Sequence, residues 1–141
     1  MNTATYNPTA RPSAGTVQNF AELGGRVLLS SLFLVSGIAK IGGYTGIEAY
    51  MTSVGVPAAL LPLVIATEVL GAIAIILGWQ TRIVAFLLAG FAVLSALIFH
   101  NDFANQIQMV MFLKNLSIAG GFFLLVAHGA GPLSLDRRAS K

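Results

Sequence analysis

Four long apolar runs, separated by short polar stretches, dominate the pattern of the chain. We expect each run to form a membrane-spanning helix, because about 20 apolar residues cross a hydrocarbon core of about 30 Å. The expected spans are Ala21–Ile41, Ala58–Leu77, Ile83–Phe99 and Met109–Ala127. The pattern therefore predicts an all-α integral membrane protein, a four-helix transmembrane bundle.

The connections between the runs carry patterns of their own. Residues 78–82, Gly-Trp-Gln-Thr-Arg, predict a tight turn that makes the second and third spans antiparallel. In the first connection, Ile47, Tyr50, Met51 and Val54 recur at i, i+3, i+4 and i+7, the spacing of one helix face. This stripe favours a short interfacial helix over the mouth of the bundle, and a loop with apolar anchors is the alternative.

Both ends of the chain are polar. Residues 1–20 are rich in proline and small residues and predict a disordered cytoplasmic tail, while residues 129–141 predict a basic cytoplasmic C-terminal tail. The four-span membrane domain then covers residues 21–128. A cleaved signal peptide that starts near Arg26 is the alternative for the first run, but Glu22 stands where a basic region is required.

Composition supports a membrane protein and excludes several other classes. The chain is 56% hydrophobic and 9% charged, whereas about a quarter of the residues in a soluble domain are charged. It has no cysteine, which excludes disulfides, thiolate zinc sites and iron–sulfur ligation. The net charge is +3, but the basic residues are scattered, so the lipid bilayer is the expected partner and nucleic acid is not.

The positions of the basic residues predict the orientation. The positive-inside rule assigns the side with more lysine and arginine near the span ends to the cytoplasm, which here holds both termini. That side holds Arg11, Arg26, Arg82, Arg137, Arg138 and Lys141. The other side holds the cations Lys40 and Lys114 with the acids Glu48 and Asp102.

Ionisable groups within the apolar runs mark the candidate site. A charge at bilayer depth is costly, so such a group usually faces the bundle interior and often has a function. A rise of 1.5 Å per residue places Glu68 roughly 15 Å, and Lys114 roughly 8 Å, below the outer ends of their spans. We therefore expect a ligand-binding cluster in the outer half of the bundle, formed by Lys40, Glu68, His100, Lys114 and Asn115.

A purely structural explanation competes with this one. A Glu68–Lys114 pair could lock two helices in register, the lysines could extend to the headgroups, and a histidine at a span end is ordinary. Four ionisable groups from four helices at one depth favour a functional pocket.

No metal is expected, because no group of ligands has metal-site spacing. His100 and His128 are expected on opposite faces and cannot ligate one haem together.

Four segments along these runs resemble a known family: Gly37-Ile38-Ala39-Lys40, Glu68-Val69-Leu70-Gly71, Phe112-Leu113-Lys114-Asn115 and Leu133-Ser134-Leu135-Asp136. From about Leu23 to Arg138 the chain resembles the DoxX family of small bacterial inner-membrane proteins. The resemblance implies a multi-pass protein of the inner (plasma) membrane. It also implies, from some members, an association with quinone-dependent oxidation or redox-stress assemblies.

The leading hypothesis is a membrane subunit of a quinone-linked oxidoreductase or redox-stress complex, without a covalently bound cofactor. Lys40 and Lys114 would donate to the oxygens of a quinone, and Glu68 and His100 would relay protons. A membrane-protein partner or a second copy is expected, because the chain alone carries no cofactor fingerprint of a complete enzyme. One alternative is a small-solute or proton-coupled transporter with Glu68 as its gate. The other is a scaffold subunit of a larger complex.

Single cysteines test the orientation, because the chain has none of its own. Asn105→Cys should react with an impermeant thiol reagent only from the outer face of membrane vesicles of known sidedness. Thr5→Cys and Ser140→Cys should react only from the cytoplasmic face. Labelling of Asn105→Cys and Ser140→Cys from the same face would contradict the predicted topology.

Overall fold

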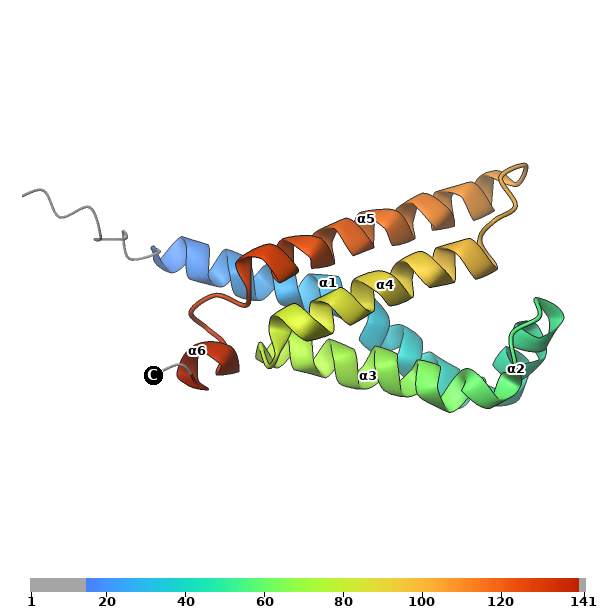
Figure 1. The fold of residues 1–141 in the computed structure, drawn as a ribbon, viewed down its shortest axis with the longest axis horizontal. Coiled ribbons are helices and arrows are strands. Elements are labelled where there is room, and N and C mark those ends of the chain that lie inside the picture. The colour runs from blue at the N-terminus through green and yellow to red at the C-terminus, as the bar shows by residue number, and fades with distance from the viewer. Residues whose placement is uncertain (1–14, 140–141) are drawn as a thin grey trace, which may run out of the picture.

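Helices form the framework of the molecule. A computed structural model describes residues 15–139, and within this part the regular elements are all helical (Figure 1). The elements are α1 (Thr16–Gly42), α2 (Tyr44–Ser53), a 3₁₀ turn (Ala58–Leu60), α3 (Leu61–Leu77), α4 (Thr81–Phe99), α5 (Gln106–His128) and α6 (Leu135–Ala139). Four helices, over residues 16–42, 58–77, 81–99 and 106–128, are long and apolar enough to cross a membrane. The prediction of an all-α bundle with four spans is confirmed.

Several boundaries differ from the predicted ones. α1 begins at Thr16, so residues 16–20 extend the first helix, and the predicted tail was wrong there. The reason is that this short stretch lacks proline and glycine, and Gln18 bonds to Glu22 one turn later. The rest of that tail, residues 1–14, lies outside the described residues. The expected short helix between the first two spans is present as α2, while the predicted C-terminal tail contains α6.

The turn between α3 and α4 reverses the chain within three residues. Gly78 ends α3 with a φ of 69°, and Gln80 precedes α4 with a φ of 48°. Both values lie in the left-handed region, which glycine adopts without strain. Gly78 is also hemmed in, because a Cβ there would collide with the guanidinium of Arg26 and the side chain of Ser134. The expected antiparallel arrangement of these two spans is confirmed.

The four long helices pack as two pairs. α1 packs along α3 and α4 packs along α5, and the pairs meet around a core that includes Phe33, Leu88 and Phe122. The pairs converge at the end that holds α6, which we call the α6 end, and diverge toward the end that holds α2, the α2 end (Figure 1). Small residues on α4 let α5 approach closely, as in many membrane bundles: Ala85, Ala89, Ala92 and Ala96 are all buried.

Arg26 binds three segments together at the α6 end. Its side chain is completely buried. Nη1 donates to the carbonyl oxygens of Ile75 and Ile76, each at 3.2 Å, and Nη2 donates to that of Leu133. The last carbonyls of a helix lack partners within the helix and favour a nearby cation. Arg26 thus caps α3 and ties it to the segment before α6, a role that the sequence did not reveal.

Asp136 provides the opposite charge at the start of α4. Its carboxylate accepts hydrogen bonds from the main-chain N–H groups of Gln80 (2.7 Å) and Thr81 (2.9 Å). Its own N–H donates to the carbonyl oxygen of Gly78 at 2.9 Å. Burial raises the pKa of Asp136, but the hydrogen bonds from Thr81 and Gln80 and the charge of Arg26 outweigh it, so the pKa lies below its usual value. Residues 133–136 therefore belong to the folded bundle.

Asp136→Asn should lower the thermal stability of the protein in detergent at neutral pH by about 1 kcal/mol. An amide NH₂, which cannot accept a hydrogen bond, replaces one of the two oxygens that accept from Gln80 and Thr81. Because folding lowers the pKa of Asp136, its charge stabilises the fold fully above the ordinary aspartate pKa of about 3.9. That contribution is lost as the pH falls further. The difference in melting temperature between wild type and variant should therefore shrink below this pH. Asp102→Asn, in the exposed α4–α5 loop, is the matched control, and an equal loss there would contradict the capping role.

Candidate functional site

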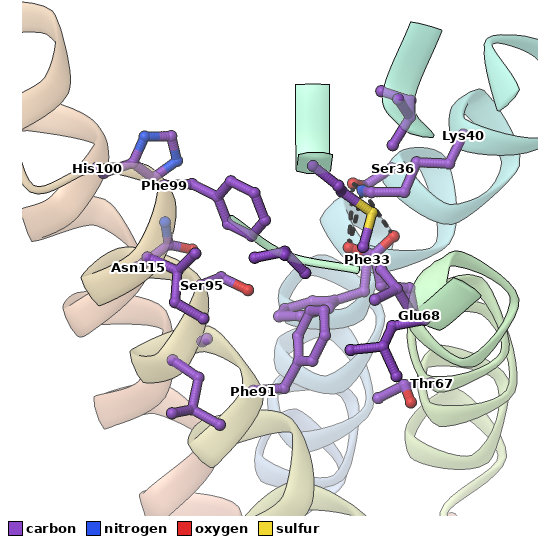
Figure 2. A pocket seen from close by; sticks show the side chains of 18 of the residues that line it. Phe33, Ser36, Lys40, Thr67, Glu68, Phe91, Ser95, Phe99, His100 and Asn115 are labelled. Atoms are coloured by element: carbon purple, nitrogen blue, oxygen red, sulfur yellow. Dashed lines mark hydrogen bonds and ion pairs between the residues drawn. The ribbon is translucent and has the colours of Figure 1, made fainter. Parts of the chain in front are cut away.

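A cavity of about 590 Å³ lies between the two helix pairs, on the α2 side of the core (Figure 2). Its lining is mostly aliphatic and aromatic, and comes from all four spans and α2. The polar groups that line it are Ser36, Lys40, Thr67, Glu68, Ser95, His100, Lys114 and Asn115. All five residues that the sequence predicted for a binding cluster are therefore found around one space.

The first polar wall is an ion pair between α1 and α3. Lys40 Nζ lies 3.0 Å from Glu68 Oε1, 2.9 Å from Oε2 and 2.6 Å from Ser36 Oγ. These contacts hold the ammonium between Ser36 and Glu68. Glu68 is only 5% exposed, and pairing with Lys40 offsets the cost of burying its charge.

A glycine brings the two partners together. Gly37 is buried, and a Cβ there would lie 2.7 Å from Val69 Cγ2 and 3.1 Å from Glu68 Cβ. The absence of a side chain therefore lets α1 and α3 approach at the level of the ion pair. Lys40 follows Gly37 by three residues, so it lies on the same face of α1.

The expected pair between Glu68 and Lys114 is not formed. Lys114 is exposed, and its Nζ lies 3.1 Å from the sulfur of Met111 on its own helix. Glu68 instead forms its salt bridge with Lys40, at 2.9 Å. The prediction was wrong because depth along a helix does not tell which helices are neighbours. α3 packs on α1, whereas α5 packs on α4, across the cavity.

The second polar wall comes from α4 and α5. His100 Nδ1 lies 2.7 Å from Gln108 Oε1, so Nδ1 carries the hydrogen of this bond. Asn115 Nδ2 donates to the carbonyl oxygen of Met111 at 3.1 Å. Figure 2 shows His100, Ser95 and Asn115 on one side of the space, with Ser36, Lys40 and Glu68 on the other.

Aromatic rings line the space between the walls. Phe33 and Phe91 lie with ring centroids 6.2 Å apart at the closed end, and Phe99 extends from α4 across the cavity (Figure 2). Tyr50 of α2 stacks on Phe99 at 5.6 Å, which links the two helix pairs near the α2 end. Sequence reasoning missed these rings and Ser36. Ser36 lies one turn before Lys40, and this spacing was the available signal.

This arrangement suits a flat, weakly polar molecule. Apolar and aromatic walls with a few convergent polar groups are typical of small-ligand pockets, which usually enclose about 300–1,000 Å³. Glu68 accepts protons or hydrogen bonds, while Lys114 and Asn115 donate them. Among residues 15–139, no three side chains of the His, Asp or Glu type gather as metal ligands.

Comparison with known proteins supports a membrane role. A family model described as DoxX matches residues 21–101. The inner membrane protein YqjF of Escherichia coli (strain K12) is 47% identical over 116 residues, which cover 82% of this chain and 89% of that protein. The inner membrane protein YphA of the same organism is 39% identical over 120 residues, with 80% and 86% covered. No solved structure matches the chain significantly.

A double-mutant cycle tests the Lys40–Glu68 pair. Lys40→Met or Glu68→Gln alone should each destabilise the protein, by about 3 kcal/mol for the loss of a partner from a buried pair, the low end of the range because Lys40 is 21% exposed. The double variant should lose less than the sum of the two, as measured by thermal unfolding in detergent. Lys114→Met is the matched control. The loss of stability that it causes should simply add to the loss caused by Glu68→Gln. Additive losses for Lys40 and Glu68 would show that the pair contributes nothing.

Proposed function

This chain belongs to the DoxX family, and we propose that it is an inner-membrane subunit that binds a quinone head group for a partner oxidoreductase. The observation that carries the proposal is the presence of polar groups on opposite walls of one aromatic-lined cavity. A quinone has two oxygens on opposite edges of a flat ring. A ring between Phe91 and Phe99 would therefore place one oxygen toward each wall.

On the α4–α5 side, Lys114, His100 and Asn115 would bind the first oxygen. Lys114 is exposed and its contact with the Met111 sulfur is weak, so its ammonium is available to a better acceptor. Asn115 has a second amide N–H, and the Nε2 of His100 faces no partner among residues 15–139. Hydrogen bonds from charged donors are about twice as strong as neutral ones. Lys114 is thus the main anchor of the proposed site.

On the α1–α3 side, Glu68 would exchange a proton with the second oxygen. As a carboxylate it accepts a hydrogen bond from a quinol hydroxyl, and as an acid it donates one to a quinone carbonyl. For Lys40 we propose a different role from the one expected from sequence. Its ammonium is bonded to Ser36 and Glu68, so it would stabilise the ionised carboxylate.

The proposal implies a partner protein and uses the predicted orientation. A quinone exchanges electrons as well as protons, and the cavity side chains provide groups for protons only. The electrons would pass to or from a partner membrane protein. With both termini in the cytoplasm, as the positive-inside rule predicts, the cavity would open toward the outer leaflet, from which an isoprenoid-tailed quinone enters.

Binding of a quinone analogue to the purified protein tests the proposal. Lys114→Met should raise the dissociation constant about tenfold or more, because one charge-assisted hydrogen bond contributes about 1.5–3 kcal/mol. Arg138→Met, which also replaces an exposed cation but lies at the α6 end, is the matched control and should bind as wild type does.

The other outcomes discriminate between functions. Flux of a solute or of protons through wild-type protein in liposomes, without quinone binding, would support the transporter. If the protein neither binds a quinone analogue, alone or with its native partner, nor supports flux, the proposal fails and the scaffold role remains.

A further inference from the structure

α1 carries a row of polar side chains on the face that packs against α3 and the C-terminal segment. Glu22, Arg26 and Ser30 follow one another at intervals of four residues, so they lie on one face of the helix. Arg26 and Ser30 are completely buried, although α1 is one of the four helices apolar enough to span the membrane. Polar groups at this depth are costly and usually serve a function.

Three atoms of this row are buried without a partner among residues 15–139: Glu22 Oε2, Arg26 Nε and Ser30 Oγ. The row is thus only partly satisfied. The Nη atoms of Arg26 bind main-chain carbonyls, and Glu22 Oε1 accepts a bond from Gln18. A buried polar atom without a hydrogen bond costs about 1–3 kcal/mol. Folded proteins satisfy such atoms with ordered water, which typically bonds to several of them at once.

Phe33 interrupts the polar face of α1. It lies between Ser30 and Ser36, is buried, and contacts Phe91 and Phe122, with ring centroids 6.2 Å and 5.4 Å away. Ser30 and Ser36 are six residues apart, which is about 9 Å along the helix axis. One water bridges donors and acceptors over about 5–6 Å at normal hydrogen-bond lengths. The two serines are therefore too far apart for a single water, and the space between them is filled by aromatic rings.

We propose that Glu22, Arg26 and Ser30, each about 6 Å from the next along the helix axis, bind a short chain of waters at the α6 end. Phe33 separates this water site from the cavity at the α2 end. The bundle then has two hydrated halves and one dry layer. Protons exchanged at Glu68 move only toward the α2 end, because the dry layer blocks the route toward Ser30. The positive charge of Arg26 adds to this barrier, since a fixed cation opposes the passage of protons. The water site needs no quinone and stands independently of the proposed function.

Hydrogen–deuterium exchange of single thiols tests the water site. The chain has no cysteine, so an introduced thiol gives a single S–D infrared band as it exchanges, clear of the O–D absorption of D₂O. After transfer to D₂O, the thiol of Ser30→Cys should exchange almost as fast as that of Val17→Cys, which is 83% exposed. Ala89→Cys, in the dry core with 0% exposure, is the buried control and should exchange at least about tenfold more slowly, because it waits for local opening. A Ser30→Cys thiol as protected as that of Ala89→Cys would overturn the water site.

Proton leakage tests the dry layer. Liposomes that contain wild-type protein should hold a pH gradient, whereas Phe33→Ser should collapse it several-fold faster, because a hydroxyl and water replace the ring. Phe86→Ser, on a lipid-facing side chain that is 60% exposed, is the matched control and should behave as wild type. A folded Phe33→Ser protein that leaves the gradient intact would overturn the barrier. If Phe33→Ser does not fold, exchange of an Ala119→Cys thiol decides the question. Ala119 is 3% exposed and belongs to the same core cluster as Phe33, so its thiol must be protected, and rapid exchange there contradicts the dry layer.

Discussion

The contact on which the arrangement of the helices depends is the one between the Arg26 guanidinium and three main-chain carbonyls. Two of these carbonyls end α3, and the third precedes α6, so one side chain joins the first span, the second span and the C-terminal segment. Asp136 completes the junction by capping α4. Helix ends leave backbone groups without partners in the helix, and here these two charged side chains satisfy several of them. Because the helix pairs are held at this end, they are able to diverge at the other.

The divergence creates the cavity, and the two pairs bring different chemistry to it. The α1–α3 pair carries its charges in a compensated form, since Lys40 and Glu68 neutralise each other beside the close helix contact at Gly37. The α4–α5 pair contributes an uncompensated lysine and neutral donors. One wall thus presents a carboxylate, while the other presents hydrogen-bond donors. A ligand in contact with both walls also connects two units that otherwise touch mainly through the aromatic core and the stack of Tyr50 on Phe99.

Polar groups occur along most of α1, but they belong to separate environments. Arg26 and Ser30 face the α6 end, whereas Ser36 and Lys40 face the cavity. The ring of Phe33, packed against Phe91 and Phe122, stands between them. The same aromatic cluster that holds the two helix pairs together therefore also divides the polar interior. A packed core and a barrier to ions have the same physical requirement, which is the exclusion of water.

The sequence alone determined the number of spans, the short helix over the mouth and five of the residues that line the cavity. These features follow from local quantities: the length of an apolar run, the period of a helix, and the rise per residue that sets the depth of Glu68 and Lys114. The tertiary structure decided which groups meet. It paired Glu68 with Lys40 rather than Lys114, and it made Arg26 a buried cap of α3. The depth of a residue along its helix does not tell which other helix lies beside that residue. Contacts between helices depend on shape, such as the missing side chain of Gly37. They also depend on segments distant in the chain, such as residues 133–136.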